Sequence, residues 1–461
     1  MTDTTITTVR GRRVWDSRGR PTVEVEVQLA TGVLGRAIAP AGASRGSNEA
    51  VDLRDGGTEF GGMGVGKAVA HVNNGISHLL IGRNALRQAE IDEDLIALDG
   101  TPGKSRLGGN AMIAASMAVL HAAAGAHRIP LYAYLAQGKS VRLPLPEIQI
   151  FGGGAHAGRR VDIQDFMVMA LCARSFDDAV AMTAEVYRAA GELMKEAGKL
   201  QGVADEGGFW PAFDSNEEAL TMLMRAIERA GYRPGEDIGI SLDVAASEFG
   251  SNGRYRLGLE SRELDSDGLC EMLLGWLARY PIVSIEDPLA EDDPEGMKAF
   301  TAAAGNRVQI IGDDFLVTNA ARVTSAASAG ACNAVLIKPN QAGTITETKA
   351  ALDAGKRAGW GTIVSARSGE TEDVTIVHLA VGWDAGQLKV GSFARSERMA
   401  KWNEALRIEE ALGAGAAFAG RTVLPGQNTE TFSPRRILHN TPLRGTQRTR
   451  RKGKSEKTKR G

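Results

Sequence analysis

The stretch Asn333-Ala-Val-Leu-Ile-Lys-Pro-Asn340 is the strongest indication of the fold of this chain. Residues 334–337 form a short apolar run with Lys338 at its C-terminal end, and Pro339 stops a strand there because proline cannot donate to a sheet. A fully apolar run of this length is typical of a parallel strand that is covered on both faces. We therefore expect Lys338 to be desolvated, which would lower its pKa toward the value that a general base needs.

The same arrangement, a short apolar run followed by a charged residue, recurs along the chain. In order, the runs and the charged residues to which they lead are 238–242 with Asp243, 282–285 with Glu286, 308–311 with Asp313 after Gly312, 362–364 with Arg367, and 388 with Lys389. Helical or loop stretches separate these runs, which predicts an α/β fold with a parallel sheet or a (β/α) barrel. Because the C-terminal ends of barrel strands converge on one site, we expect these carboxylates and lysines to face one another.

The bulk composition is that of a soluble globular protein. The chain has 461 residues, enough for two or three domains, and is 43% hydrophobic and 24% charged. We find no apolar run that approaches the length needed to cross a bilayer, and residues 1–10 are polar with no signal-peptide core. The three cysteines are scattered and lack metal-ligand spacing. We therefore expect a cytoplasmic protein without membrane contact.

Charge is distributed unevenly between the body of the chain and its last segment. From residue 435 to the end there are 11 basic residues and one acid, whereas the preceding part carries 43 basic and 55 acidic residues. The segment 426–461 therefore reads as a basic, disordered tail. Weak attachment to RNA through counterion release is one interpretation, and a solvated tail without a nucleic-acid partner is the one that we favour.

The hydrophobic patterns divide the body into two domains. Residues 1–140 predict an α+β capping domain, and residues 141–425 predict a (β/α)₈-type barrel. In the first, residues 22–29 alternate as a half-buried strand, residues 33–39 return as its hairpin partner, and helices are expected at 67–80, 88–98 and 110–125. Residues 143–146, with two prolines, indicate the linker, followed by a strand at 165–170 and an amphipathic helix at 176–198.

Two glycine-rich stretches have a composition that is found in ligand-binding loops. Residues 61–67 spell G-x-x-x-x-G-K, but Ala68 stands where a phosphate loop needs Ser or Thr and no apolar strand precedes it, which excludes a nucleotide site. In residues 151–158, glycines flank His156 just before a barrel strand. This composition suits either a lid that closes over substrate or an ordinary loop.

The charged residues at the strand ends suit one kind of chemistry. Asp243, Glu286 and Asp313 offer hard oxygen ligands, which Mg²⁺ prefers. A Mg²⁺ ion facing a lysine base suits proton abstraction next to a carboxylate, because the metal takes up charge on the enediolate. Glu206, in the small-residue stretch 202–209, is placed to protonate a leaving hydroxyl, and Arg367 with the adjacent Ser368 offers a phosphate clamp.

From about residue 5 to residue 421 the chain resembles enolase (phosphopyruvate hydratase). The motifs that carry the resemblance are Asp16-Ser-Arg-Gly-Arg-Pro-Thr-Val-Glu24, Gly42-Ala-Ser44, Asp205-Glu-Gly-Gly-Phe209, Ser284-Ile-Glu-Asp-Pro288, Gly312-Asp-Asp-Phe-Leu-Val-Thr-Asn319, Leu336-Ile-Lys-Pro-Asn-Gln341, Arg367-Ser-Gly-Glu-Thr-Glu-Asp373 and Arg395-Ser-Glu-Arg398. Enolase-superfamily sites use a Lys or His base together with Mg²⁺, as is known in general.

The resemblance implies a modified (β/α)₈ barrel with an N-terminal α+β cap, and two Mg²⁺ ions acting on a small phosphorylated hydroxy acid. It also implies a homodimer or a larger ring of dimers. The roles that it implies are Lys338 as the base, Glu206 as the acid, Asp243, Glu286 and Asp313 on the first Mg²⁺, Ser44 on the second, His156, Arg367 and Ser368 on the phosphate, Lys389 on the carboxylate, and Gln164 with Asp165 lining the site.

The chain departs from the enolase pattern at several of these positions. Enolases read Ser-His-Arg-Ser-Gly where Ala366 replaces the imidazole here, and Gln-Glu-Phe where Asp165 is one methylene shorter. Arg45 stands where the loop after Ser44 has Thr, and Arg159 where the lid has Asn. Size is thus lost near the leaving hydroxyl, and cations are gained near the phosphate.

These departures leave the substrate open between two interpretations. One is a modified 2-phosphoglycerate with extra anionic bulk on phosphorus, as in carboxyphosphonoenolpyruvate synthase of phosphonate pathways. The other is an ordinary glycolytic enolase that tolerates the changes. An enolase-like binding protein without turnover is a third reading, against which the retention of Lys338 and Glu206 argues. A lysine Schiff-base aldolase would not need the three carboxylates.

Overall fold

The computed structural model describes residues 3–425, all of which belong to one compact unit. The predicted basic segment 426–461 lies outside the described residues, so its predicted disorder remains a prediction.

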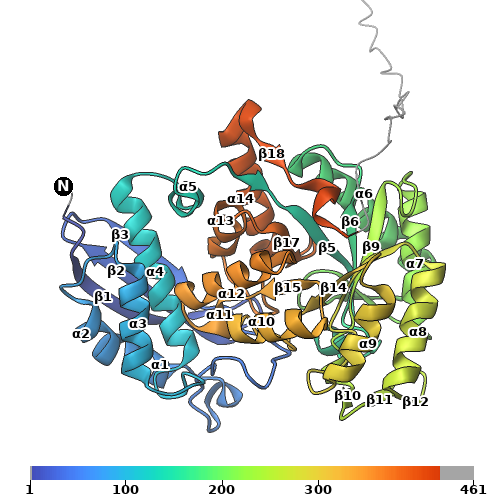
Figure 1. Ribbon diagram of the computed structural model, residues 1–461, viewed down its shortest axis with the longest axis horizontal. Helices are drawn as coiled ribbons and strands as arrows, with labels where there is room; N and C mark the ends of the chain where they lie inside the picture. Colours follow the sequence, from blue (N-terminus) through green and yellow to red (C-terminus); the bar gives the residue numbers. More distant parts are fainter. Residues whose placement is uncertain (1–2, 426–461) are drawn as a thin grey trace, which may run out of the picture. The chain divides into compact units, whose positions relative to one another are not determined.

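The N-terminal part is built on a three-stranded antiparallel sheet with the order β1-β2-β3. Its strands are β1 (Ile6–Trp15), β2 (Pro21–Leu29) and β3 (Leu34–Ile38), and the predicted hairpin of β2 and β3 is confirmed. Val23, Val25 and Val27 are fully buried, and helix α4 (Gly109–His127) packs on β2 and β3 (Figure 1). A side chain at Gly35 would lie 2.1 Å from the Ala118 carbonyl, so this glycine permits the close approach of helix to sheet. Strand β1 was not predicted.

The predicted helices of this part are present. The segment expected at 67–80 consists of α1 (Gly66–His71), a π-helical turn (Val72–Ile76) and α2 (Ser77–Leu80), and the next helix is α3 (Gln88–Asp99). Helix α4 is long and apolar enough to cross a membrane by length and composition, which we had not expected of any segment. It is a core helix, because 83% of that window is buried inside the protein.

Eight strands close into a barrel. In barrel order they are β5 (Leu145–Gly152), β6 (Asp165–Ala170), β9 (Ile238–Asp243), β13 (Ile282–Glu286), β14 (Gln309–Gly312), β15 (Ala334–Ile337), β16 (Gly361–Ser365) and β17 (Gly386–Gly391), which pairs back with β5. The strand ends predicted at Asp243, Glu286, Gly312 and Ile337 are confirmed, whereas Lys389 lies within β17 and not at its end. One feature differs from the predicted parallel repeat, because β6 runs antiparallel to both of its neighbours, β5 and β9.

The predicted linker at residues 143–146 is wrong. Residues 145 and 146 already belong to β5, where Leu388 of β17 pairs with Pro146. The two prolines indicated a turn, but pairing with β17 closes the barrel here and overrides that local preference. The predicted loop 151–158 likewise begins as the end of β5 and continues as a short 3₁₀ turn, η3 (Gly154–Ala157).

The remaining elements surround the barrel or extend from it (Figure 1). The helices are α5 (Leu131–Ala136), α6 (Phe176–Glu196), α7 (Asn216–Arg229), α8 (Ser266–Arg279), α9 (Pro294–Ala304), α10 (Ala320–Ala329), α11 (Pro339–Ala342), α12 (Ile345–Arg357), α13 (Thr375–Gly382) and α14 (Ser396–Leu412). Several begin at side chains that accept a backbone N–H, as Ser175, Ser215 and Thr344 do. The additional strands are β4 (Arg142–Leu143), β7 (Leu200–Val203), β8 (Phe209–Pro211), β10 (Gly250–Ser251), β11 (Arg254–Leu257), β12 (Arg262–Asp265) and β18 (Ala417–Phe418).

The N-terminal part and the barrel are joined by buried polar contacts. The Arg367 guanidinium, after β16, binds the Glu49 carboxylate, and a β-bridge pairs Ala41 with Gly369. The Asp92 carboxylate accepts from the Thr346 hydroxyl and amide at the start of α12. The contacts around Arg367 place the loop of residues 41–49 against the C-terminal ends of the barrel strands.

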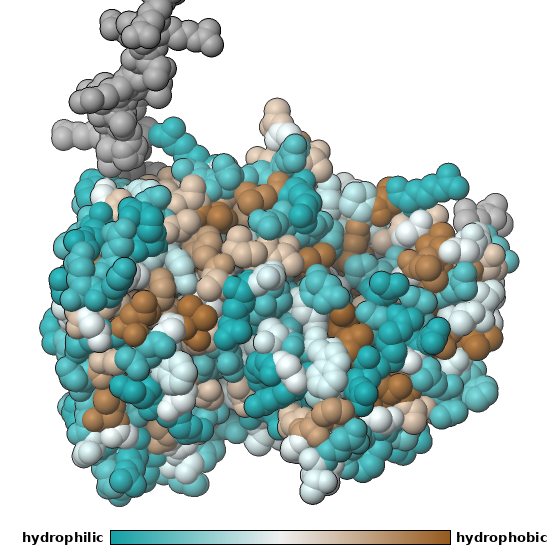
Figure 2. Space-filling view, turned by 180° about the vertical axis from the view of Figure 1, so that it is seen from behind, coloured by the Kyte–Doolittle hydropathy of each residue, from teal (hydrophilic) through white to brown (hydrophobic). Residues whose placement is uncertain are grey.

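The surface face in Figure 2 is largely hydrophilic, with hydrophobic residues in several separate groups.

Candidate active site

Most of the predicted site residues line one small pocket. Its lining consists of Ser44, His156, Gln164, Asp165, Glu206, Asp243, Lys338, Ser365, Ala366, Arg367, Ser368 and Lys389. The pocket has about 10 Å³ of free volume, which is roughly the space of one water molecule. Of the residues predicted at strand ends, Asp243, Lys338, Arg367 and Lys389 line this pocket together with Ser44 and Glu206 from two loops. Glu286 and Asp313 are not among its lining residues.

The predicted metal ligands are held by two lysines. Lys389 Nζ lies 2.8 Å from Asp243 Oδ2 and 2.7 Å from Glu286 Oε2, and Lys338 Nζ pairs closely with Asp313 Oδ2. Among residues 3–425, the groups of three ligating side chains whose atoms lie within 4.8 Å of one another are His156–Asp165–Glu206 and Asp287–Asp313–Asp314. The structure does not bring Asp243, Glu286 and Asp313 together to that distance.

The lysines differ from the sequence-based expectation. We expected burial to lower the pKa of Lys338; burial does act in that direction, but the Asp313 and Glu286 carboxylates outweigh it, and the pKa is raised. The pKa of Lys389 is raised well above its usual value, because Asp243 and Glu286 outweigh the effect of burial. A pattern of apolar residues indicates desolvation, but it does not show which carboxylates lie next to the amine.

A second group of buried residues gathers around His156 in η3. Its Nδ1 lies 3.3 Å from Asp165 Oδ1, and its Nε2 lies 3.0 Å from Ser368 Oγ and 3.9 Å from Glu206 Oε1. Arg398 Nη1 lies 4.0 Å from the same Glu206 oxygen. The carboxyl group of Glu206 thus faces one imidazole and one guanidinium inside the protein.

The electrostatics of this group shift the pKa values of Glu206 and Asp165 in opposite directions. Burial raises the pKa of Glu206, although His156 and Arg398 oppose the shift. Burial alone would raise the pKa of Asp165 as well, but His156, Lys389 and hydrogen bonds lower it to about 2. The pKa of His156 is raised, because Glu206 and Asp165 outweigh its burial. Two neighbouring carboxyl groups are therefore driven in opposite directions, a pattern typical of an acid beside a fixed anion.

Arg367 is buried, and both of its terminal nitrogens donate hydrogen bonds. Its Nη1 donates to Glu49 Oε2 (2.9 Å) and to Asn340 Oδ1 (3.0 Å), and its Nη2 donates to the Ser44 carbonyl (3.0 Å) and to Glu49 Oε1 (3.1 Å). The sequence analysis missed Glu49, which fixes the fork of the guanidinium. Burial lowers the pKa of Arg367, but Glu49 outweighs it and the pKa is raised.

The structure does not place two of the predicted specificity residues in the pocket. Arg45 is about half exposed and its Nη1 lies 3.8 Å from Asp52 Oδ2, and Arg159 is exposed and paired with Glu248 at 2.7 Å. The expectation that both add cations beside a substrate phosphate is therefore not met by this conformation, because nearer carboxylates pair with them. Ala366 does line the pocket and is buried.

Buried amides were also missed from the sequence. Gln149 on β5 and Gln341 in α11 are buried and each hydrogen-bonds a site carboxylate, Asp165 and Asp313 respectively. For Gln149 a signal was present, because Glu147 and Gln149 alternate with apolar residues in a strand that is buried throughout. A polar residue in such a strand needs an internal partner.

Comparison with known proteins accounts for both parts of the chain. The family model described as "Enolase, N-terminal domain" matches residues 6–135, and "Enolase, C-terminal TIM barrel domain" matches residues 140–426. The chain belongs to the enolase family. Enolase 1 of Desulfitobacterium hafniense (strain Y51) is 51% identical over 421 residues, which cover 91% of this chain and 96% of that relative. The resemblance inferred from the motifs and the barrel fold are thereby confirmed, and the chain is an enolase superfamily lyase.

Enolases generally use Mg²⁺, and the site supplies ligands of the type that this ion prefers, although Asp243, Glu286 and Asp313 pair with lysines in this conformation. The donors at the strand ends are carboxylate oxygens, which hard divalent cations prefer. Within the described part of the chain, Glu286 Oε1 is buried without a hydrogen-bond partner, and so is Gln164 Oε1. A buried acceptor without a donor is costly unless a cation or a ligand group satisfies it.

Proposed function

We propose that this protein catalyses the Mg²⁺-dependent dehydration of 2-phosphoglycerate to phosphoenolpyruvate, the enolase step of glycolysis. The observation that carries the proposal is that Lys338 and Glu206, a base and an acid from separate elements, line the same pocket as the site carboxylates. The 51% identity with an enolase over nearly the whole chain supports the same substrate class.

The reaction needs one proton removed and one supplied. Lys338 Nζ takes the proton from C2, which requires the neutral amine and therefore that Asp313 and Glu286 no longer raise its pKa, as when a bound cation offsets their charge. The electrons of the C–H bond form the enediolate of the carboxylate. The C3–O bond then breaks, Glu206 gives its proton to the leaving hydroxyl, and the C2–C3 double bond and a water molecule result. Asp243, Glu286 and Asp313 would hold one Mg²⁺, and the Ser44 loop a second; bound there, Mg²⁺ supplies positive charge that stabilises the enediolate.

The other residues would position the substrate. Arg367, Ser368 and His156 are proposed to bind the phosphate. Lys389, Gln164 and Asp165, which line the same pocket, are proposed to face the carboxylate end. As it stands, the pocket has room for about one water molecule. We propose that the loops that carry Ser44 and His156 move apart when the substrate enters and exclude water when they return.

A direct assay tests the proposal. Purified protein with Mg²⁺ and 2-phosphoglycerate is followed by the ultraviolet absorbance of the enol ester, and C2 proton exchange is followed in D₂O. We expect turnover in the wild type, loss of both reactions in Lys338→Ala, and loss of elimination with retained exchange in Glu206→Gln. If neither reaction occurs with 2-phosphoglycerate or its analogues, the protein is a non-catalytic member of the family and the proposal is wrong.

A second candidate substrate is a 2-phosphoglycerate analogue with added bulk on phosphorus, as a carboxyphosphonoenolpyruvate synthase would use. One observation favours it: a methyl group, Ala366, lines the pocket where enolases carry an imidazole. Arg45 pairs with Asp52 and Arg159 pairs with Glu248, so these two arginines give no further support for the analogue as substrate. Rapid turnover of 2-phosphoglycerate would exclude the analogue as the main substrate, whereas turnover of a phosphonoformate-derived substrate alone would establish it.

We also propose, by analogy with the family, a homodimer or a larger ring of dimers, which light scattering coupled to gel filtration measures directly.

The division at residues 140 and 141 into cap and barrel remains our proposal for the domain boundary. A cytoplasmic location is supported by Cys172, Cys270 and Cys332, which are all free thiols.

A further inference from the structure

One buried amide connects the two halves of the acid group. Gln149 is fully buried on β5. Its Nε2 donates a hydrogen bond to Asp165 Oδ1 on β6, and its Oε1 accepts from the Gly208 amide at 2.8 Å. A side-chain amide can donate to a carboxylate and accept from an N–H at the same time, and Gln149 uses its nitrogen and its oxygen in these two contacts.

Gly208 closes the loop that carries Glu206. Its carbonyl accepts from the Ala204 amide at 2.8 Å, and the Gly207 amide donates to the Ala204 carbonyl at 3.0 Å. A Cβ atom at Gly208 would lie 2.4 Å from Gln149 Oε1, so the backbone approaches the amide as closely as a glycine allows. The loop is thereby held against β5 by the Gln149 side chain.

The Gln149 amide also contacts Asp165, which in turn contacts the imidazole of His156. Asp165 Oδ1, to which Gln149 donates, lies 3.3 Å from His156 Nδ1, and His156 Nε2 lies 3.9 Å from Glu206 Oε1. The path from Gln149 through Asp165 and His156, and the path through Gly208, both end at Glu206. A change at Gln149 therefore alters the position of the acid by two routes.

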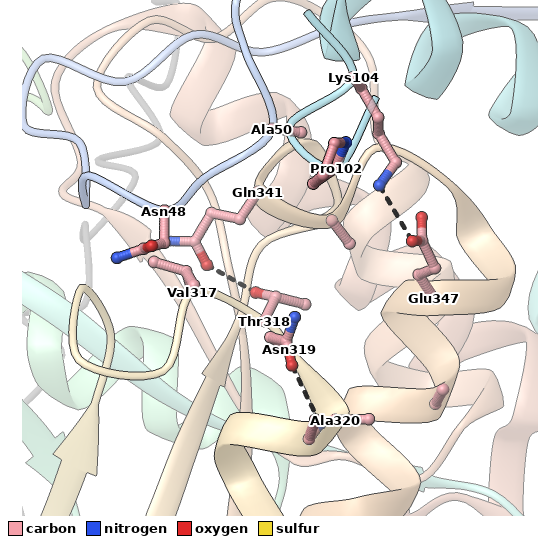
Figure 3. Close-up of a pocket in the computed structure, with 13 residues that line it drawn as sticks. Asn48, Ala50, Pro102, Lys104, Val317, Thr318, Asn319, Ala320, Gln341 and Glu347 are labelled. Atoms are coloured by element: carbon pink, nitrogen blue, oxygen red, sulfur yellow. Dashed lines mark hydrogen bonds and ion pairs between the residues drawn. The ribbon is translucent and has the colours of Figure 1, made fainter. Parts of the chain in front are cut away.

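We infer that Gln149 is a positioning residue that sets the place of Glu206 relative to His156, and so controls the loss of the hydroxyl but not the removal of the C2 proton. The inference rests on the proposed function. The base side has an amide of its own: Gln341 donates to Asp313 Oδ1 at 2.9 Å and accepts from the Thr318 hydroxyl at 2.6 Å (Figure 3), and Thr318 Oγ1 in turn accepts from the Lys338 amide. Each half of the reaction is thus supported by one buried glutamine.

The test compares three leucine variants of similar volume. Gln149→Leu removes the amide on the acid side, and Gln341→Leu removes the amide on the base side. Gln309→Leu is the structural control, because Gln309 is equally buried but pairs with Gln387 and Ser284 and does not line the pocket. For each we measure C2 proton exchange in D₂O, formation of the enol ester, and hydrogen–deuterium exchange of the backbone peptide 200–211 by mass spectrometry.

In Gln149→Leu we expect enol ester formation to fall about 10²-fold, as a displacement of roughly 1 Å does, while C2 exchange changes less than about threefold. Gln341→Leu should lower both reactions, and Gln309→Leu should leave their ratio unchanged. Equal loss of exchange and elimination in Gln149→Leu, or no loss of either, overturns the inference.

The backbone measurement separates this inference from the proposed function. Loss of the Gly208 hydrogen bond should speed deuterium uptake in peptide 200–211 of Gln149→Leu and not of Gln309→Leu. If the wild type catalyses neither reaction, the proposed function fails, and the uptake result alone decides whether Gln149 holds the loop. Unchanged uptake refutes the positioning role in either case.

Discussion

Replacing Gly42 by alanine tests how the loop of the N-terminal part holds Arg367. A Cβ atom at Gly42 would lie 2.0 Å from Arg367 Nη2, 2.7 Å from its Cζ and 2.6 Å from the Ser44 carbonyl. An ordinary contact needs about 3.5 Å, so the loop or the guanidinium must shift by roughly 1.5 Å. Overpacking of this kind costs about 1–3 kcal/mol of folding free energy. Because Arg367 is the proposed phosphate ligand, we expect kcat/KM for 2-phosphoglycerate to fall at least ~10²-fold.

The assay is steady-state formation of the enol ester, with thermal unfolding measured on the same samples. Gly275→Ala is the matched control, because Gly275 lies in α8 with no heavy atom within 4 Å of the added methyl group. That control should keep its activity and gain up to about 1 kcal/mol of stability. Wild-type kcat/KM in Gly42→Ala would refute the reasoning, since it would mean that the contact between this loop and Arg367 does not position the phosphate ligand.

Three further predictions concern the pocket, the metal and pH. Ala366→His should raise turnover of 2-phosphoglycerate several-fold, and an unchanged rate would show that the missing imidazole does not limit this reaction. Chelation with EDTA should abolish both C2 exchange and elimination, with recovery on adding Mg²⁺; activity that survives complete chelation would contradict the assigned carboxylates. Burial lowers the pKa of His378 from 6.5 to about 4, even though Glu404 opposes the shift. The unfolded chain therefore binds more protons in that window, and stability should fall by up to about 3 kcal/mol as the pH drops from 6.5 to 4. His378→Gln should flatten this part of a denaturation series, and an equal slope would count against burial as the cause.

The barrel was predictable because most of its strands are buried on both faces, which favours short apolar runs. The apolar runs before Asp243, Glu286 and Lys338 therefore stand out in the sequence, and so do these three charged residues. The antiparallel direction of β6 left no such mark, because a fully buried strand has the same composition whichever way it runs. Pro146 was likewise misread, since its pairing with β17 is a contact between residues far apart in the chain.

The site divides in the same way. The sequence by itself predicted which chemical groups to expect: residue type and position at a strand end suggest a base and hard oxygen ligands, the loop of residues 202–209 suggests an acid, and the closed barrel brings most of them to one rim. Only the tertiary structure decided which partner each group has. Arg159 faces Glu248 and not the pocket, Arg367 is held by Glu49, and Gln149 joins Asp165 to Gly208. These pairings depend on distances of a few ångströms between segments that are remote in the chain, and the local pattern of residues carries no record of them.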